Sequence, residues 1–325
     1  MKKTLALILT LIIIGTGLIS CAGTGNDGKI SVVCTIFPEY DWVRSIISGC
    51  DDIELTLLID NGVDLHNYKP TVKDLAKITS CDLFVYVGGE SDSWVKDALA
   101  QATNKDMKVL ALLDLLGERS LEEEEVEGMQ EEEEHGRGEE EEEDGGPEYD
   151  EHIWLSLRNA KHLCSLITDE LSKLAPDGAG TFRSNYVNYA KELDALDKEF
   201  RSFTETSEDC TIVVADRFPF RYLAHDYKIK YFAAFSGCSA ETEASFQTIA
   251  TLANKVNEYS IKHLVITESS DGKIARTVKE TSGADCDIIV MNSIQAVTGD
   301  QIKQGATYLT LMRGNLEALK RALQN

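Results

Sequence analysis

Hydrophobic and polar residues alternate along the first part of the chain in the manner of strand–helix–strand units. Short, nearly continuous apolar runs are separated by amphipathic segments in which apolar residues recur every three or four positions. The runs that we expect to form strands are 30–37, 53–59, 83–87 and 107–112, and the segments that we expect to form helices are 40–47, 72–78 and 94–102. Such alternation predicts a parallel sheet with helices on its faces.

The same alternation restarts near residue 211, after two segments with a purely helical pattern. The first has apolar residues at strict three- and four-residue spacing from Leu157 to Leu174, with His162 off this stripe and therefore expected in solvent. The second, 181–205, is a long charged helix with a thin apolar stripe, which suits a connector between two lobes. Beyond it we expect strands at 211–215, 229–232, 263–266 and 287–291, and helices at 218–226, 241–256, 273–281 and 308–323.

We therefore predict an α/β protein with two lobes, each a mainly parallel sheet flanked by helices, joined by one long helix. The N-terminal lobe is expected to span 30–180 and the C-terminal lobe 206–325, with 181–205 as the connecting helix.

The N-terminus has the features of an export signal. Two lysines precede an apolar run that is too short to cross a bilayer comfortably, so we expect a signal peptide at 1–20. The run ends in Leu18-Ile19-Ser20-Cys21, which resembles a bacterial lipobox, and Cys21 is the expected lipidation site. An ordinary secretory signal with a chance cysteine is the alternative. Residues 21–29 then form a flexible tether that holds the protein at the extracytoplasmic face of the cell membrane.

Negative charge is concentrated in one segment. Between Glu122 and Glu151 lie eighteen acidic residues and a single base, Arg137, so this block accounts for −17 of the formal charge of −24. Self-repulsion and lack of apolar surface predict a disordered loop over 118–149, in which His135 is exposed. The loop is either a solubilising surface or a weak attractor for divalent cations. The overall charge argues against a nucleic-acid partner.

Seven cysteines remain after Cys21, an odd number with no Cys-x-x-Cys pair. Most fall within apolar patterns, so we interpret them mainly as small buried residues, with a disulfide as the minority interpretation.

Histidines and acids follow several of the expected strands, where side chains converge at the carboxyl edge of a parallel sheet. His66 follows the strand 53–59, and His152 follows the acidic loop. Asp216 ends the strand 211–215, and Glu268 follows the strand 263–266. Motifs typical of serine hydrolases, nucleotide-binding loops and zinc peptidases are absent from the sequence.

Two of these segments carry a resemblance to a known family. Asp64-Leu65-His66-Asn67-Tyr68-Lys69-Pro70-Thr71 resembles the first-ligand motif of the metal-binding solute receptors of zinc and manganese ABC importers, with Leu65 in place of a usual proline. Asp150-Glu151-His152-Ile153-Trp154-Leu155-Ser156 resembles the second-ligand motif, and it follows a charged loop as in zinc-type members. The resemblance covers essentially the whole mature chain and implies that His66 and His152 are metal ligands.

The third ligand position departs from the family pattern, in which a histidine or glutamate follows the first strand of the second lobe. Here the segment reads Ala215-Asp216-Arg217-Phe218, and Asp216 is the nearest oxygen donor because Arg217 has no free lone pair. A helix cap is the alternative role for Asp216, and His225 or water is the alternative third ligand. Glu268 is the expected fourth ligand, with Asp271 as the alternative.

The resulting prediction is a receptor, not an enzyme, that captures Zn²⁺ and delivers it to the membrane permease of an ABC importer as a monomer. A set of two imidazoles and two carboxylates suits zinc, whereas manganese prefers more oxygens, so a Mn²⁺ receptor is the first alternative. A cell-surface zinc-dependent hydrolase and an adhesin with a structural metal are the others.

Overall fold

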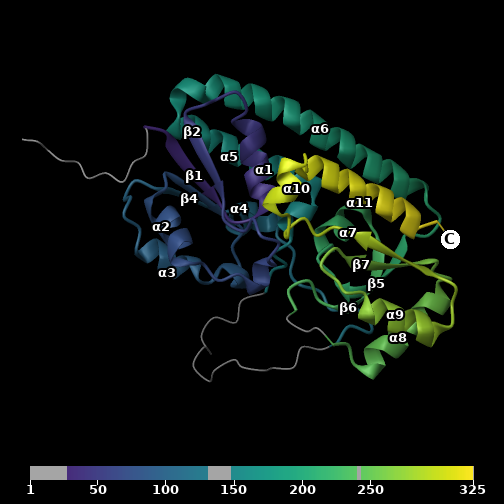
Figure 1. The fold of residues 1–325 in the computed structure, drawn as a ribbon. Coiled ribbons are helices and arrows are strands. Elements are labelled where there is room, and N and C mark those ends of the chain that lie inside the picture. The colour runs from purple at the N-terminus through teal and green to yellow at the C-terminus, as the bar shows by residue number, and fades with distance from the viewer. Residues whose placement is uncertain (1–27, 131–147, 240–242, 325) are drawn as a thin grey trace, which may run out of the picture.

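The computed structural model describes residues 28–130, 148–239 and 243–324, which form two α/β lobes (Figure 1). The N-terminal sheet has four parallel strands in the order β2-β1-β3-β4. Their bounds are β1 Ile30–Cys34, β2 Ile53–Leu57, β3 Leu83–Tyr86 and β4 Lys108–Ala111. The C-terminal sheet repeats this topology in the order β6-β5-β7-β8. Its bounds are β5 Thr211–Arg217, β6 Lys230–Phe235, β7 His263–Thr267 and β8 Asp287–Met291.

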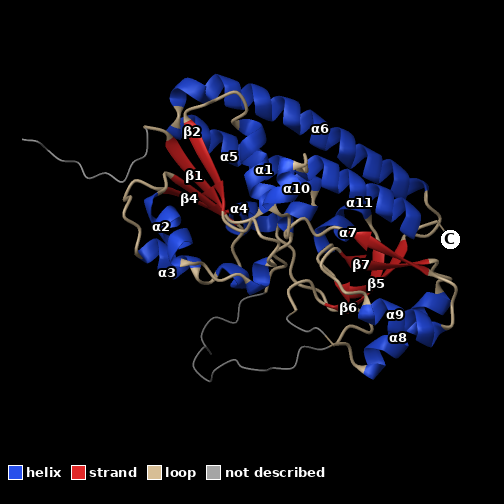
Figure 2. Cartoon of the chain, viewed as in Figure 1, coloured by secondary structure: helices blue, strands red, loops and turns tan. Residues whose placement is uncertain are grey.

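Helices flank both sheets, as the alternation of patterns predicts (Figure 2). Those of the first lobe are α1 Phe37–Ile46, α2 Val72–Ser80, α3 Val95–Ala100, α4 Leu112–Leu116 and α5 Leu157–Leu174. Those of the second lobe are α7 Arg221–Tyr227, α8 Phe246–Glu258, α9 Lys273–Ser282, α10 Gly299–Lys303 and α11 Tyr308–Ala322. The α/β class and the two-sheet architecture predicted from the sequence are confirmed.

Local chemistry explains where several helices begin. Thr71 and Asp74 form a reciprocal capping box at the start of α2, and the Ser156 hydroxyl accepts from the backbone amide of Asn159 at the start of α5. The expected helix at 218–226 begins only at Arg221. Pro219 accounts for Phe218 lying outside the helix, because the residue before a proline is disfavoured in the helical conformation.

One long helix, α6 Ala179–Thr206, runs along both lobes (Figure 1). The lobes also share a buried core: a continuous hydrophobic cluster extends from the β1 and β3 side chains of the first lobe to α7 and α11 of the second. A separate small core lies between the second sheet and the pair α8 and α9. The larger core crosses the boundary between the lobes, so moving the lobes far apart would expose apolar surface. Each Å² exposed would cost about 25 cal/mol of free energy. We therefore expect the two lobes to move little relative to each other, with any rearrangement confined to loops.

The start of the acidic segment packs against the second lobe. Glu124 pairs with Arg221 at 2.9 Å, and Glu127 pairs with Lys255 at 2.9 Å. Residues 118–130 and 148–149 of the segment expected to be disordered are thus among the described residues, and basic side chains of the second lobe pair with acids of this segment. The rest of the block, 131–147, lies outside the described residues, as do the expected signal peptide at 1–20 and Cys21.

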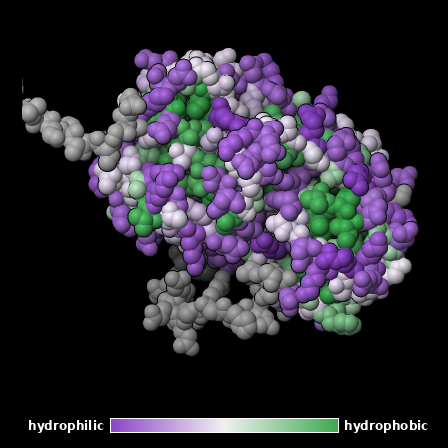
Figure 3. All heavy atoms as spheres, in the orientation of Figure 1, coloured by the Kyte–Doolittle hydropathy of each residue, from purple (hydrophilic) through white to green (hydrophobic). Residues whose placement is uncertain are grey.

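The face shown in Figure 3 is mostly hydrophilic, with hydrophobic residues in separate patches. Among the helices of the described ranges, none is both long enough and apolar enough to cross a bilayer. The seven cysteines beyond Cys21 are all unpaired, and four of them are buried, so the interpretation of these residues as small core side chains is confirmed in the main.

Candidate metal centre

His66 lies on a short 3₁₀ helix, η1 Leu65–Asn67, beyond the carboxyl end of β2. The Asp64 carboxylate caps this turn by accepting from the His66 amide at 3.0 Å. The Nδ1 atom of the ring lies 2.6 Å from Ser91 Oγ, on the segment that follows β3. A hydrogen bond at Nδ1 fixes the ring orientation and leaves Nε2 to face His152.

His152 immediately precedes a second 3₁₀ helix, η4 Ile153–Leu155, and its side chain is fully buried. Asp150 Oδ1 accepts from the His152 amide at 2.8 Å and lies 3.2 Å from Nδ1 of the ring. A carboxylate at Nδ1 orients a metal-binding imidazole and makes its Nε2 a better donor to a metal.

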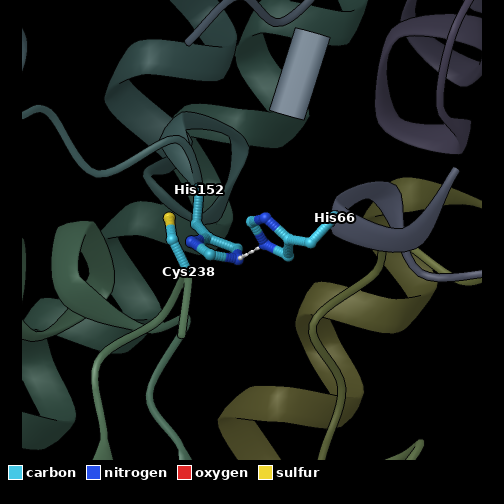
Figure 4. A group of neighbouring side chains, drawn as sticks. All are labelled: His66, His152 and Cys238. Carbon is cyan, nitrogen blue, oxygen red and sulfur yellow. Dashed lines mark hydrogen bonds between the residues drawn. The ribbon is translucent and has the colours of Figure 1, made fainter. Parts of the chain in front are cut away.

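The two rings meet at their Nε2 atoms, which lie 3.4 Å apart (Figure 4). Two nitrogens at about 2.0–2.1 Å from one zinc ion in tetrahedral geometry would be separated by about 3.3–3.4 Å. Segments 86 residues apart in the chain thus place two ring nitrogens at the spacing that one zinc ion requires. The pair His66 and His152 is the part of the predicted ligand set that the structure brings together.

Cys238 also lies at this point, and sequence reasoning missed it (Figure 4). Its Sγ and one ring nitrogen from each histidine all lie within 4.8 Å of one another, which is the only such group of three among the described residues. Burial raises the pKa of the Cys238 thiol, and the carboxylates of Asp150 and Glu123 raise it further. The expected strand at 229–232 ended too early, so the sequence did not place Cys238 directly after a strand; β6 in fact continues to Phe235.

Gly237 explains how the Cys238 loop comes so close. A Cβ atom at Gly237 would lie 2.9 Å from the Phe218 carbonyl oxygen and 3.0 Å from His152 Cε1. Both distances are at or below the shortest contacts that a Cβ atom normally makes. Any side chain at this position would therefore push the loop away from the imidazole.

The predicted oxygen ligands do not join the group of three. The Asp216 carboxylate accepts from the Thr267 amide at 3.0 Å and from the Thr267 hydroxyl at 2.7 Å. Glu268 accepts from the Ser293 hydroxyl at 2.6 Å and from its amide at 2.7 Å. Both carboxylates are thus occupied by hydrogen bonds, and their assignment as ligands stays a prediction.

The two alternative ligands lie apart from this centre. The His225 side chain is 58% exposed on α7, with Nδ1 3.9 Å from Asp226. Asp271 is exposed and accepts from the Lys273 amide at 2.7 Å.

Arg217, at the end of β5, connects the two loops that carry His66 and Cys238. Its guanidinium lies 2.7 Å from Asp64 Oδ2 and donates to the Ser239 carbonyl at 3.4 Å. Asp64 Oδ2 also accepts from Gln295 at 3.1 Å. The turn that carries His66 is therefore tied to the second lobe at two points.

The two imidazoles differ in their electrostatic surroundings. Burial, together with the neighbouring His152 and Arg217, lowers the pKa of His66 to about 4. Burial also opposes a charge on His152, but the carboxylates of Asp150 and Glu151 outweigh it and raise its pKa. The first proton that enters this pair therefore goes to His152.

Three buried carboxyl groups lie behind His66 in the first lobe: Glu39, Asp92 and Glu151. Glu151 Oε2 is 3.9 Å from His66 Nδ1, and Asp92 accepts from the Gly88 amide at 3.0 Å. Each of the three has one buried oxygen without a hydrogen-bond partner among the described residues. Burial, together with the nearby Glu151, raises the pKa of Asp92 to about 7.

Replacing Asp92 with Asn is expected to stabilise the apoprotein at pH 8. A carboxyl whose pKa is raised on folding contributes stability that is complete below its unfolded pKa of about 4 and is lost as the pH rises through 7. Asn keeps an acceptor for Gly88 and carries no charge, so the gain at pH 8 is on the order of 4 kcal/mol. Urea unfolding at pH 4.5 and pH 8 measures it. The exposed Asp97→Asn on α3 is the matched control, and an equal effect of Asp92→Asn at both pH values would contradict the prediction.

Comparison with known proteins identifies the family. The family model "Zinc-uptake complex component A periplasmic" matches residues 32–322. The high-affinity zinc uptake system protein ZnuA of Bacillus subtilis is 30% identical over 96% of this chain and 94% of its own length. The zinc-binding lipoprotein AdcA of Streptococcus pneumoniae is 32% identical over 98% of this chain, which spans only 61% of that longer protein.

The solved structures agree with this result. The crystal structure of the Zn(II)-bound ZnuA-like domain of Streptococcus pneumoniae AdcA is 29% identical, with a TM-score of 0.70, over 92% of this chain and all of that domain. Because the family model matches residues 32–322, this protein belongs to the family of periplasmic A components of zinc-uptake complexes.

Proposed function

We propose that this protein captures Zn²⁺ outside the cytoplasmic membrane and delivers it to the permease of an ABC importer. The observation that supports this most directly is the His66–His152 pair, whose Nε2 atoms have the spacing of two ligands on one zinc ion. The relatives named as zinc-binding and zinc-uptake proteins support the same cargo. We expect binding and release of the ion without catalytic turnover.

The proposed ligands that the described geometry supports are His66 and His152. Asp216 and Glu268 complete the set predicted from the sequence, and each would have to give up hydrogen bonds to do so. Asp216 would leave Thr267, and Glu268 would leave Ser293. A local rearrangement at the ends of β5 and β7 would allow this without separating the lobes.

The expected cellular arrangement follows from the N-terminus and the family. Cys21 as a lipid-bearing residue would hold the protein at the extracytoplasmic face, and a similar protein is named a lipoprotein. The tether at 21–29 would then keep the protein close to the permease of the importer. We expect the protein to act as a monomer.

Metal content and thermal stability test the proposed function. Protein purified without added metal should contain zinc, and zinc added to the stripped protein should raise the melting temperature. Ligand at 100 times its dissociation constant stabilises by about 2.7 kcal/mol, so the shift should grow with the logarithm of zinc excess. Manganese at the same concentrations should give a smaller shift. Failure of zinc to bind the stripped, folded protein would contradict the proposal.

A further inference from the structure

We infer that Cys238 supplies a thiolate as the third zinc ligand, so that the centre is a His₂Cys site that selects zinc and softer cations over manganese. This inference rests on the proposed function and names the metal class that the site accepts. It assigns the third position to a residue that neither the strand pattern nor the sequence motifs single out.

The geometry requires only a small movement of the thiol. With a zinc–sulfur distance of about 2.3 Å and zinc–nitrogen distances of about 2.0–2.1 Å, a tetrahedral site separates sulfur from each nitrogen by about 3.5–3.6 Å. The three donor atoms already lie within 4.8 Å of one another. Sulfur therefore has to come closer to the Nε2 atoms than the 4.8 Å that bounds this group, and rotation of the cysteine side chain can contribute to that approach.

The backbone around Cys238 is positioned so that the thiol can approach the two histidines. Gly237 lets the loop pass against the His152 ring, as its missing Cβ shows. Arg217 holds the next residue, Ser239, through its carbonyl oxygen. Asp64, bound to the same guanidinium, caps the turn that carries His66. One side chain thus links the loops of two proposed ligands from opposite lobes.

The other candidates for the third position are less able to reach the metal. Arg217 carries five donors and no lone pair for a cation. The Asp216 carboxylate is turned toward Thr267 on the neighbouring strand β7. Among the described residues, Cys238 is the donor that groups with both histidines.

The chemistry of the donor set then determines the cargo. On binding, the thiol loses its proton to solvent and the sulfur lone pair forms the bond to the metal, so charge and atoms balance: Zn²⁺ and R–SH give Zn–SR⁺ and H⁺. Thiolate is a soft ligand that favours zinc and copper(I), whereas manganese favours carboxylate, carbonyl and water oxygens. A thiolate in place of an oxygen ligand should therefore raise the preference for zinc.

Cobalt substitution tests this inference in the full mature chain. Co²⁺ replaces zinc in tetrahedral sites, and a thiolate ligand adds an intense charge-transfer band in the near ultraviolet. The unmodified protein and the control Cys50→Ser, at another half-buried cysteine, should both show the band. Cys238→Ser should lose it, bind zinc at least about 10-fold more weakly and change manganese binding little, so that the zinc-to-manganese ratio falls.

Two outcomes are distinguishable. If Cys238→Ser keeps the band and the zinc affinity, the inference is wrong, while the proposed receptor function stands. If the unmodified protein binds neither Co²⁺ nor Zn²⁺, both the inference and the proposed function fail.

A second measurement covers the case in which the variant does not fold. In the unmodified protein, zinc should slow alkylation of Cys238 by iodoacetamide by at least about 10-fold, because a metal-bound sulfur is not a free thiolate. Peptide mass spectrometry reports each cysteine separately, with Cys50 as the internal control. Equal alkylation of Cys238 with and without zinc would overturn the inference.

Discussion

Replacing His152 with Ala is expected to weaken zinc binding by well over 100-fold. Loss of a residue that merely orients a metal ligand typically costs 10–100-fold in affinity, and His152 is proposed to bind the metal directly. The vacated space is enclosed, because the side chain is fully buried and packs beside Trp154. Competition titration of the stripped protein with a zinc chelator measures the loss.

His225→Ala is the matched control, since this histidine is exposed on α7 and should leave affinity unchanged. The His152 variant should fold, because the shared core that joins the lobes does not depend on the imidazole. Circular dichroism of the apoprotein establishes that point. Zinc affinity within threefold of the parent in a folded His152→Ala protein would exclude His152 as a ligand.

The second large effect concerns pH. A ligating imidazole must be neutral, so protons compete with zinc for the pair. The carboxylates around His152 raise its pKa above the ordinary value near 6.5, whereas that of His66 is about 4. As the pH falls from 8, the slope of log zinc affinity against pH should increase by one unit once His152 begins to protonate, because one proton then competes with each zinc ion. His66 should take up a second proton only near pH 4. Above that pH, the protonation of His152 alone should lower the zinc affinity about tenfold per pH unit.

Asp150→Asn provides the diagnostic variant. Removing the carboxylate that lies 3.2 Å from Nδ1 takes away a main cause of the raised His152 pKa. The pH at which the slope of log affinity changes should therefore be lower in this variant. Affinity at pH 8 should also fall by about 10–100-fold, because the ring loses its orienting partner. Isothermal titration at several pH values in buffers of different ionisation enthalpy measures both effects. An unchanged slope between pH 8 and 5 in the parent would contradict a site that contains His152.

Much of the fold follows from local pattern. The eight strands and the connecting helix were predicted with small errors at their ends, because burial on both faces of a parallel sheet gives continuous apolar runs. The predicted ends of elements were wrong where a single residue or a tertiary contact changes the local structure. The helix expected at 218 starts at Arg221, beyond Pro219, and the acidic segment contacts the second lobe through ion pairs with Arg221 and Lys255.

The candidate site divides in the same way. The sequence by itself predicted the two histidines, because each lies in a short motif whose neighbouring residues hold it in place: Asp64 caps the His66 turn, and Asp150 orients the His152 ring. For the remaining positions it indicated Asp216 and Glu268 and missed Cys238, because the strand β6 that precedes Cys238 was expected to end too early. Only the tertiary structure decided which of these donors lies beside the histidine pair. That depends on hydrogen bonds that turn Asp216 toward Thr267 and on a glycine that lets the Cys238 loop touch His152. Hydrophobic periodicity records which face of each element is buried, whereas the convergence of donors from two lobes depends on how those lobes pack against each other.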